Sequence, residues 1–452
     1  MSDSHIPALT RLTTFVPPKP KPWLINALTW VNRYVMLKGT PVLRNWPVLK
    51  HLPLIRGLCD VRYINFPHAD TQRFARSTAA TNACVITPNH PEFFTDWMLD
   101  KELAARFSPY MASWATHDIV NGMGGGMQKF WLANHIIAQI PNHTEAALDY
   151  SVQAILSGTP VLLHPEGNVL WHSDQVQHCF AGGAKIALQA AQQDADRPIL
   201  IAPIVWKLVF IHNETRALER EVSLIEKRLK LPSSKGRLLS DRVRLVYEGV
   251  LQQRSRLFGC HVIKRGAYFA QQADYLNQLV APLWPQFCPD TDRIDDVDAA
   301  EANAKRLLQA IRAQTKQGLK LDQDTHRRQQ EVSRLLRTAA MVYAEPTWQL
   351  EHIAENLKRL RCDLLKKHWR DQLHVFVPRP VGGRVAHIRV PEPIDVRAAL
   401  AANPALSAED IMIEVQQRLQ HSLDTLNQAL SRQRARPSFV NPFTLADEAE
   451  PD

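Results

Sequence analysis

The chain contains no uninterrupted apolar run of about 18 residues, which is the length that a membrane-spanning helix needs. Its six cysteines form no Cys-x-x-Cys pair, and this scatter predicts reduced thiols in a cytosolic setting rather than a disulfide framework. An apolar stretch begins only after the Pro-Lys run at residues 17–22, so no secretory signal peptide is expected. These absences predict a soluble or peripheral protein.

Several motifs that define common classes of enzyme are also absent. No Gly-x-Ser-x-Gly elbow is present, so a serine esterase is not expected. Residues 122–126, Gly-Met-Gly-Gly-Gly, lack the Lys-Ser/Thr of a phosphate-binding loop and are interpreted as a flexible loop. His164, His172 and His178 have no metal-ligand spacing. We therefore expect neither a metal nor a bound cofactor.

Acidic residues are scarce near the N-terminus. Residues 1–56 contain eight Lys or Arg but a single Asp, in a chain whose total net charge is +9. A basic cluster of this kind binds polyanions such as anionic lipid headgroups, nucleic acid or an acidic protein. Because no nucleic-acid-binding signature accompanies the cluster, nucleic acid is not an expected partner.

The same segment combines apolar side chains with regularly spaced prolines. Residues 23–36 have helical spacing of aliphatic side chains, flanked by Trp23, Trp30 and Tyr34. Three six-residue repeats follow, and each begins with proline and carries one cation: 41–46, 47–52 and 53–58. The pattern favours an amphipathic segment on an anionic membrane surface. The alternative is a packed helix followed by an irregular stretch that covers the core.

The remaining chain predicts an α/β fold. Short apolar runs alternate with helical spacing, which favours a largely parallel sheet flanked by helices. Strands are expected at 61–66, 83–87, 160–164, 199–206, 373–377 and 384–390. Helices are expected at 144–157, 184–195, 299–315, 348–369 and 408–432.

The change of composition along the chain predicts its organisation. Residues 214–373 are charged, glycine-poor and rich in Leu, Ala, Gln and Arg, whereas strand-like segments surround them on both sides. They are therefore expected to form a long helical insertion in the α/β domain. The expected parts are a basic N-terminal segment at 1–58, the α/β core at 59–213, the insertion at 214–373, returning strands and a last helix at 374–432, and a tail at 433–452.

Two loops contain residues suited to chemistry. Each directly follows an expected strand, and ligands of open α/β sheets bind beyond the carboxyl ends of the strands. The loops are residues 87–96, Thr-Pro-Asn-His-Pro-Glu-Phe-Phe-Thr-Asp, and residues 164–168, His-Pro-Glu-Gly-Asn. A histidine beside a carboxylate can act as a general base, because the carboxylate fixes the imidazole tautomer and stabilises the imidazolium. The alternative is that His90 caps the following helix.

Together the two loops resemble the glycerolipid acyltransferases, the 1-acylglycerol-3-phosphate O-acyltransferase superfamily. The resemblance lies in Asn89-His90 with an acid shortly after, and in Pro165-Glu166-Gly167 further along the chain. Later segments are similar to further blocks of the family: 180–184 (Phe-x-Gly-Gly-Ala), 202–204 (Ala-Pro-Ile) and 384–394. The resemblance covers residues 60–210 and 384–396. The helical block at 214–373 resembles the insertion of a bacterial subgroup of the family.

The resemblance implies a mechanism. His90 takes the proton from an acceptor hydroxyl, which attacks the thioester of acyl-CoA or acyl-carrier protein, and backbone amides stabilise the oxyanion. An acid near His90 orients it. The residues that the resemblance assigns to substrate binding are Glu166, Gly167, Asn89 and Asn168.

The chain departs from the family pattern at three places, one of which is Glu-Gly-Asn-Val at 166–169 where the family usually has Glu-Gly-Thr-Arg. The family has four residues between the histidine and its aspartate, whereas five separate His90 from Asp96. Either the loop bulges by one residue and Asp96 remains the partner, or Glu92 replaces it. The family's second block also carries an arginine for the acceptor phosphate, but residues 136–142 contain none, so the acceptor stays open.

The expected function is transfer of a fatty acyl group from acyl-CoA or acyl-carrier protein to a hydroxyl of a lyso-glycerolipid or related acceptor. The protein is expected at the cytoplasmic face of the membrane, where residues 1–58 contact the anionic surface. The alternative is a catalytically weak or inactive relative that binds lipid or a protein partner there.

Overall fold

A computed structural model describes residues 14–43, 46, 48, 52–121, 125–140, 144–167, 169, 172–262, 267–294, 296–337, 345–365, 378, 380–433 and 437–444. The chain forms two compact units. The first contains residues 1–212 and 373–435, and the second contains residues 213–372 and 436–452. The strand expected at 373–377 and the glycine loop at 122–124 lie outside the described residues.

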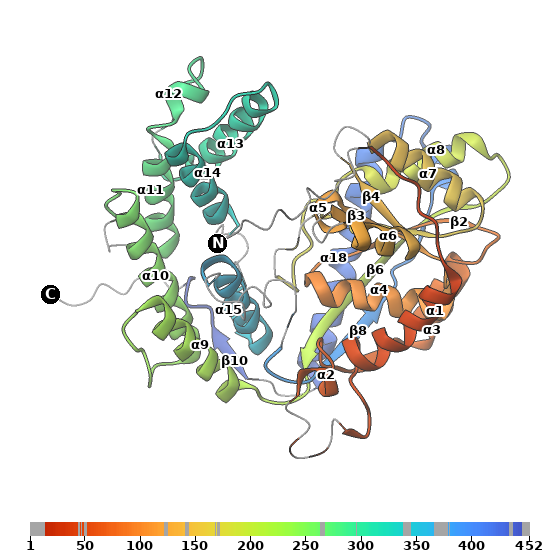
Figure 1. Cartoon of the computed structure of the whole chain (residues 1–452), viewed down its shortest axis with the longest axis horizontal. Coiled ribbons are helices and arrows are strands. Elements are labelled where there is room, and N and C mark those ends of the chain that lie inside the picture. The colour runs from red at the N-terminus through yellow and green to blue at the C-terminus, as the bar shows by residue number, and fades with distance from the viewer. Residues whose placement is uncertain are drawn as a thin grey trace, which may run out of the picture. The chain divides into compact units, whose positions relative to one another are not determined.

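The first unit is built on a mixed, mostly parallel sheet (Figure 1). Its strand order is β1-β8-β6-β2-β5-β3-β4, and β9 also pairs with β6. Strands β8 and β9 run antiparallel to β6, whereas β2, β5, β3 and β4 are parallel to it. The strands are β1 (Val61–Asn65), β2 (Ala83–Pro88), β3 (Ala112–Thr116), β4 (Ile136–Gln139), β5 (Val161–Leu162), β6 (Ile199–Phe210), β8 (Arg384–Arg389) and β9 (Ile394–Asp395).

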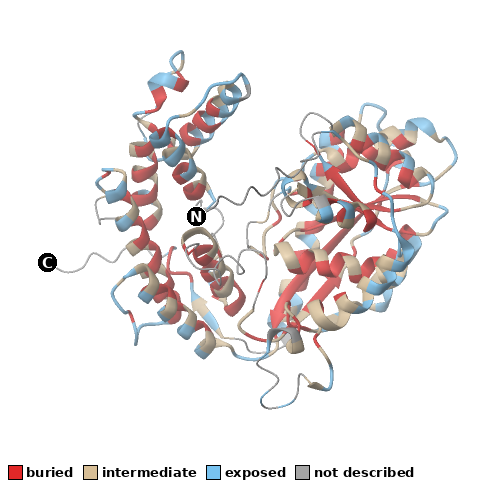
Figure 2. Cartoon of the chain, in the orientation of Figure 1, coloured by how far each residue is buried: buried red, intermediate tan, exposed pale blue. Residues whose placement is uncertain are grey.

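Helices cover both faces of this sheet, so the expected α/β class is confirmed. On one face, α3 (His68–Ser77) and α4 (Phe93–Phe107) pack on side chains such as Ile86 and Trp206. On the other face lie α7 (Thr144–Leu156), α8 (Gly182–Gln193), α17 (Val396–Ala402) and α18 (Ala408–Gln433). Strands β2, β5 and β6 are almost wholly buried between these layers, whereas β1 and β3 are partly exposed (Figure 2).

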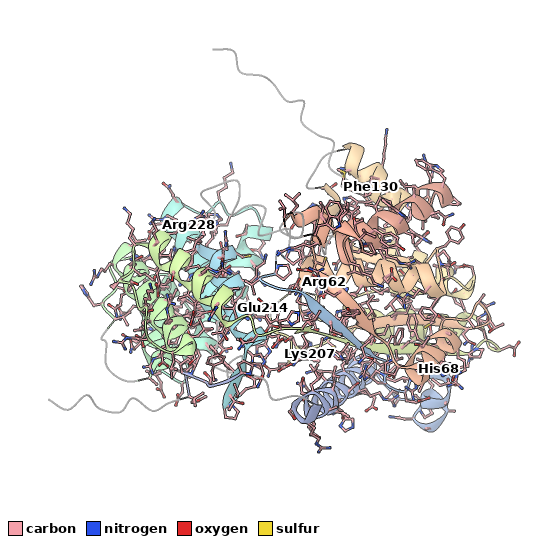
Figure 3. All side chains as sticks on the ribbon, turned by 90° about the horizontal axis from the view of Figure 1, so that it is seen from below. Arg62, His68, Phe130, Lys207, Glu214 and Arg228 are labelled. Carbon is pink, nitrogen blue, oxygen red and sulfur yellow. The ribbon has the colours of Figure 1, made fainter. Side chains whose placement is uncertain are left out.

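Strand β6 is the longest strand of the sheet and runs through its middle. Its β-branched and aliphatic residues suit a strand that is covered on both faces. Lys207 is the charged exception, and its buried ammonium group pairs with Asp174 and lies 2.6 Å from Asn427 Oδ1 of α18 (Figure 3). This pairing compensates a charge that would be costly in a dry core.

The N-terminal segment packs on α4. It forms α1 (Pro22–Val31), which continues as the π-helix η1 (Asn32–Leu37), and the short helix α2 (Pro53–Arg56). Asn32 Nδ2 donates to the carbonyl of Met98, and the Arg33 guanidinium lies 3.1 Å from the buried Glu102 carboxylate. Over the part of the chain that the structure describes, no helix has the length and apolarity to cross a membrane.

Two short helices, α5 (His117–Asn121) and α6 (Gly125–Ala133), lie near the β3–β4 end of the sheet. The backbone N–H groups of Lys19 and Lys21 donate to the carbonyls of Leu132 and Ala133 at the end of α6. Residues 19–21, directly before α1, are therefore fixed beside α6.

The second unit is mainly helical. It contains α9 (Thr215–Leu229), α10 (Leu239–Leu257), α11 (Tyr268–Val280), α12 (Trp284–Phe287), α13 (Ala300–Lys316), α14 (Gln323–Leu336) and α15 (Leu350–Leu364). Its two strands, β7 (Thr347–Gln349) and β10 (Ser438–Val440), pair antiparallel. Two expectations change here: Trp348 belongs to a strand rather than to the following helix, and the expected tail contains β10.

Candidate active site

The first loop leaves the sheet at the end of β2, where Asn89 attaches it to β6. Asn89 Oδ1 accepts the backbone N–H of Trp206 at 2.9 Å, and Asn89 Nδ2 donates to the Trp206 carbonyl at 3.1 Å. The buried amide side chain thus continues the pairing between β2 and β6 by one residue. Asn89 was expected to bind substrate, but these contacts use its side chain to position the next residue, His90.

His90 and Asp96 form the expected pair. His90 Nδ1 lies 2.9 Å from Asp96 Oδ2, and Asp96 sits in the first turn of α4. Asp96 is fully buried and accepts two further N–H groups, from the Glu92 backbone at 2.8 Å and from Trp206 Nε1 at 3.1 Å. Helix α4 begins only at Phe93, so residues 91 and 92 belong to the loop before it. The additional residue between His90 and Asp96 is accommodated in this loop.

Glu92, the alternative partner of His90, has a different contact. Its carboxylate forms a buried ion pair with Arg384 of β8, with Oε2 at 2.5 Å from Nη1 and Oε1 at 3.0 Å from Nη2. The same guanidinium donates to the Cys59 carbonyl at 2.7 Å. Glu92 therefore ties the loop to β8, whereas Asp96 contacts the imidazole.

Glu166 holds the two loops together. Its Oε1 accepts the His90 backbone N–H at 2.6 Å, and its Oε2 accepts the Gln177 N–H at 2.8 Å. The side chain is buried, so its carboxylate shapes the loop that carries His90. The resemblance assigns Glu166 to substrate binding, but both oxygens have backbone partners in this structure.

Gly167 turns the chain at the rim of the site. Its φ of +69° lies in the left-handed region, and an added Cβ would lie 3.0–3.1 Å from the ring of Phe180. Asn168, the fourth residue assigned to substrate binding, lies outside the described residues.

A cavity of about 780 Å³ opens beside His90 and within the first unit. Its described lining contains two carboxyl groups, Asp100 and Asp118, and no Lys or Arg. Aromatic rings supply much of the remaining wall: Phe93, Phe94, Trp97, Trp114, Trp131 and Phe180. A cavity of this size and polarity suits an apolar chain with few polar groups.

The surroundings of His90 favour its neutral form. Burial lowers the pKa of His90 well below 6.5, and the neighbouring His164 lowers it further. Burial raises the pKa of Asp96, while the N–H donors of Glu92 and Trp206 act in the opposite direction by stabilising the carboxylate. Burial likewise raises the pKa of Glu166, against the effect of its two backbone donors. A neutral imidazole is the form that accepts a proton.

The structure adds three side chains to the site that the sequence did not predict: His164, Asp100 and Trp206. The ring of His164 stacks on His90, with 4.0 Å between centroids, and its Nε2 lies 3.1 Å from Asp100 Oδ2. The sequence contained one signal for Asp100, because Asp96 and Asp100 are four residues apart and so share a helix face. Trp206 lies 110 residues from Asp96, and no local pattern indicates that contact.

No group of three or more His, Cys, Asp or Glu side chains that could hold a metal ion occurs among the described residues. Neither a protein-family model nor a curated protein sequence matches this chain. The resemblance to the acyltransferases therefore stays a prediction from the motifs.

Proposed function

We propose that this chain is an O-acyltransferase related to the 1-acylglycerol-3-phosphate O-acyltransferases. It transfers a fatty acyl group from acyl-CoA or acyl-carrier protein to a hydroxyl of a lyso-glycerolipid or related acceptor. The observation that supports this most is the His90–Asp96 pair, at 2.9 Å, on the wall of a cavity rich in aromatic rings. That combination offers a base beside a space for an acyl chain.

The reaction follows from the tautomer of His90. The Asp96 carboxylate accepts a hydrogen bond from Nδ1–H of His90, so Nε2 carries no proton and can take one from the acceptor hydroxyl. The hydroxyl oxygen attacks the thioester carbonyl and forms the new C–O bond. When the tetrahedral intermediate collapses, the C–S bond breaks, and the thiolate receives the proton from Nε2. The products are the ester and the free thiol.

The direct experiment supplies purified protein with an acyl-CoA and a panel of lyso-lipid and other hydroxyl acceptors. Free thiol is followed spectroscopically and the lipid product by mass spectrometry. His90→Ala should lower the rate by about 10²–10⁴-fold, because general-base catalysis is typically worth that much, and should preserve the circular dichroism spectrum. Near-wild-type turnover by a folded His90→Ala protein would exclude this mechanism.

The alternative function is lipid binding without catalysis. It is favoured by the absence of a Lys or Arg from the described cavity lining, which leaves an acceptor phosphate without a cationic partner there. Saturable binding of a lyso-lipid by wild-type protein, with no thiol release from any acyl donor and acceptor pair, would support this second function and reject the first.

We also propose that the protein is peripheral at the cytoplasmic face of the membrane, with residues 1–58 on an anionic surface. Trp23 and Trp30 of α1 are 68% and 62% exposed, and Val48 is 80% exposed. Tryptophan is favoured at the boundary between headgroups and acyl chains, and lysine and arginine are attracted to anionic lipids. Lys19 and Lys21 lie beside α6, whose Trp131 lines the cavity, so this surface adjoins the proposed site.

A further inference from the structure

A second histidine–acid pair lies against the first. Asp96 and Asp100 are one helical turn apart on α4, and each carboxyl group contacts a different imidazole. His164, at the end of β5, stacks on His90 with an angle of 23° between the ring planes. Both histidine side chains are mostly buried, at 14% and 13% exposure, so the two pairs form one connected group.

The contacts of His164 differ from those of His90. His164 Nδ1 lies 3.2 Å from the carbonyl oxygen of Asn89, which can only accept a hydrogen bond. His164 Nε2 lies 3.1 Å from Asp100 Oδ2. Both ring nitrogens of His164 therefore face acceptors. No nitrogen of His164 remains for the substrate, so its effect must act through His90.

We propose that the His164–Asp100 pair is a positioning device that keeps His90 neutral and fixes its ring beside the cavity. The catalytic role of this pair rests on the proposed acyl transfer. Its effect on the protonation of His90 does not depend on that reaction. Two imidazolium rings stacked at 4.0 Å would repel each other strongly in a buried site. A positive charge on His164 would therefore oppose protonation of its neighbour His90.

The other charged groups around His90 are accounted for by their own contacts. Asp96 accepts from Nδ1, and Glu166 accepts the His90 backbone N–H. Glu92 is neutralised by Arg384 of β8, and His172 faces Glu166. Of these groups, Asp96 favours the imidazolium form of His90. The pKa of His90 nevertheless lies well below 6.5, because burial and the charge of His164 outweigh the effect of Asp96.

The sign of the pH effect follows directly. The base must be unprotonated, so wild-type kcat/KM should hold its value as the pH falls through 6.5 and decline only at the lower pKa of His90. His164→Phe keeps a stacked ring but removes both hydrogen bonds and the charge. The pKa of His90 should then rise, and the acid limb should move upward toward neutral pH.

The experiment combines this profile with ¹⁵N NMR of full-length, histidine-labelled protein, which needs no substrate. At neutral pH, wild-type His90 should carry a proton on Nδ1 only. In His164→Phe the titration midpoint of His90 should rise, whereas His421→Phe, an exposed histidine of α18, should change nothing.

The outcomes separate the two proposals. If the NMR results are as expected but no acyl transfer is detected, the positioning pair is supported and the proposed reaction is rejected. A His90 midpoint that is unchanged in a folded His164→Phe protein would overturn the pair. If His164→Phe does not fold, the His90 midpoint in His164→Gln decides the question in the same way, because that change also removes the imidazole.

Discussion

At the scale of residues, the two acids near His90 have separate tasks. Asp96 holds the imidazole tautomer, whereas Glu92 pairs with Arg384. Asp96→Asn should therefore lower turnover by on the order of 10²–10⁴-fold, because an amide can no longer enforce the Nδ1–H tautomer. Rates of thiol release, normalised to folded protein, measure the effect.

Glu92→Gln is the matched control for Asp96→Asn. It leaves the Arg384 guanidinium buried without its anion, which should lower the free energy of unfolding by about 3–5 kcal/mol while turnover per folded molecule is largely kept. Denaturant unfolding of both variants gives the comparison. A catalytic loss with Glu92→Gln as large as that with Asp96→Asn would contradict the assignment of the partner.

How much of this site the sequence predicts depends on distance along the chain. His90, Asp96 and Glu166 were predicted because each belongs to a short stretch of sequence that directly follows an apolar run. The contact of Glu92 with Arg384 spans 292 residues, and that of His164 with Asp100 spans 64. Such pairs are set by the order of strands in the sheet, which local composition does not encode.

At the scale of elements, the same reasoning explains which strands were predicted. The runs in β2 and β6 are apolar except for Thr87 and Lys207, as expected of strands buried on both faces. β3 reads Ala-Ser-Trp-Ala-Thr and β4 has four residues, so neither has a clear period in the sequence. β10 has three residues and depends on pairing with β7 for its register.

Helix α1 is the element on which the membrane proposal depends. Trp23 and Trp30 are seven residues apart and so lie on the same side of the helix, and Lys19 and Lys21 are also exposed. Changing the two tryptophans to Ser should weaken binding to phosphatidylglycerol-containing vesicles by about thirtyfold, if roughly 2 kcal/mol of burial is lost. Cosedimentation measures the binding.

Further variants separate charge from burial. Lys19→Gln with Lys21→Gln should weaken binding at low salt and reduce its dependence on salt. Arg33 is unsuited to this test, because its change would remove a partner of the buried Glu102. Leu238→Ser with Leu257→Ser removes exposed apolar side chains of the second unit and should leave binding unchanged. If all three double variants bind like wild type, α1 is not the membrane contact.

At the scale of the whole molecule, each unit has its own core. The first is organised around β6, and the second contains an aromatic cluster in which Phe443, near the end of the chain, contacts Tyr247, Tyr268, Phe269 and Trp348. Phe443 follows β10, so the pairing of β10 with β7 places this ring in the cluster. The sequence did not predict this contact, because residues 433–452 were expected to form a tail outside any core.

Phe443→Ala tests whether the two cores are energetically separate. Phe443 is 6% exposed, and truncation of a buried phenylalanine typically costs about 3–5 kcal/mol. Amide hydrogen exchange should accelerate in α10, α11 and α15 and stay unchanged in α4, β2 and β6, since each unit opens on its own. Val440→Ala changes a 56% exposed residue of the same segment and should alter stability by less than about 0.5 kcal/mol. Acceleration that spreads to β6 and α4 would mean that the two units unfold together, and the site around His90 would then depend on the helical unit for its stability.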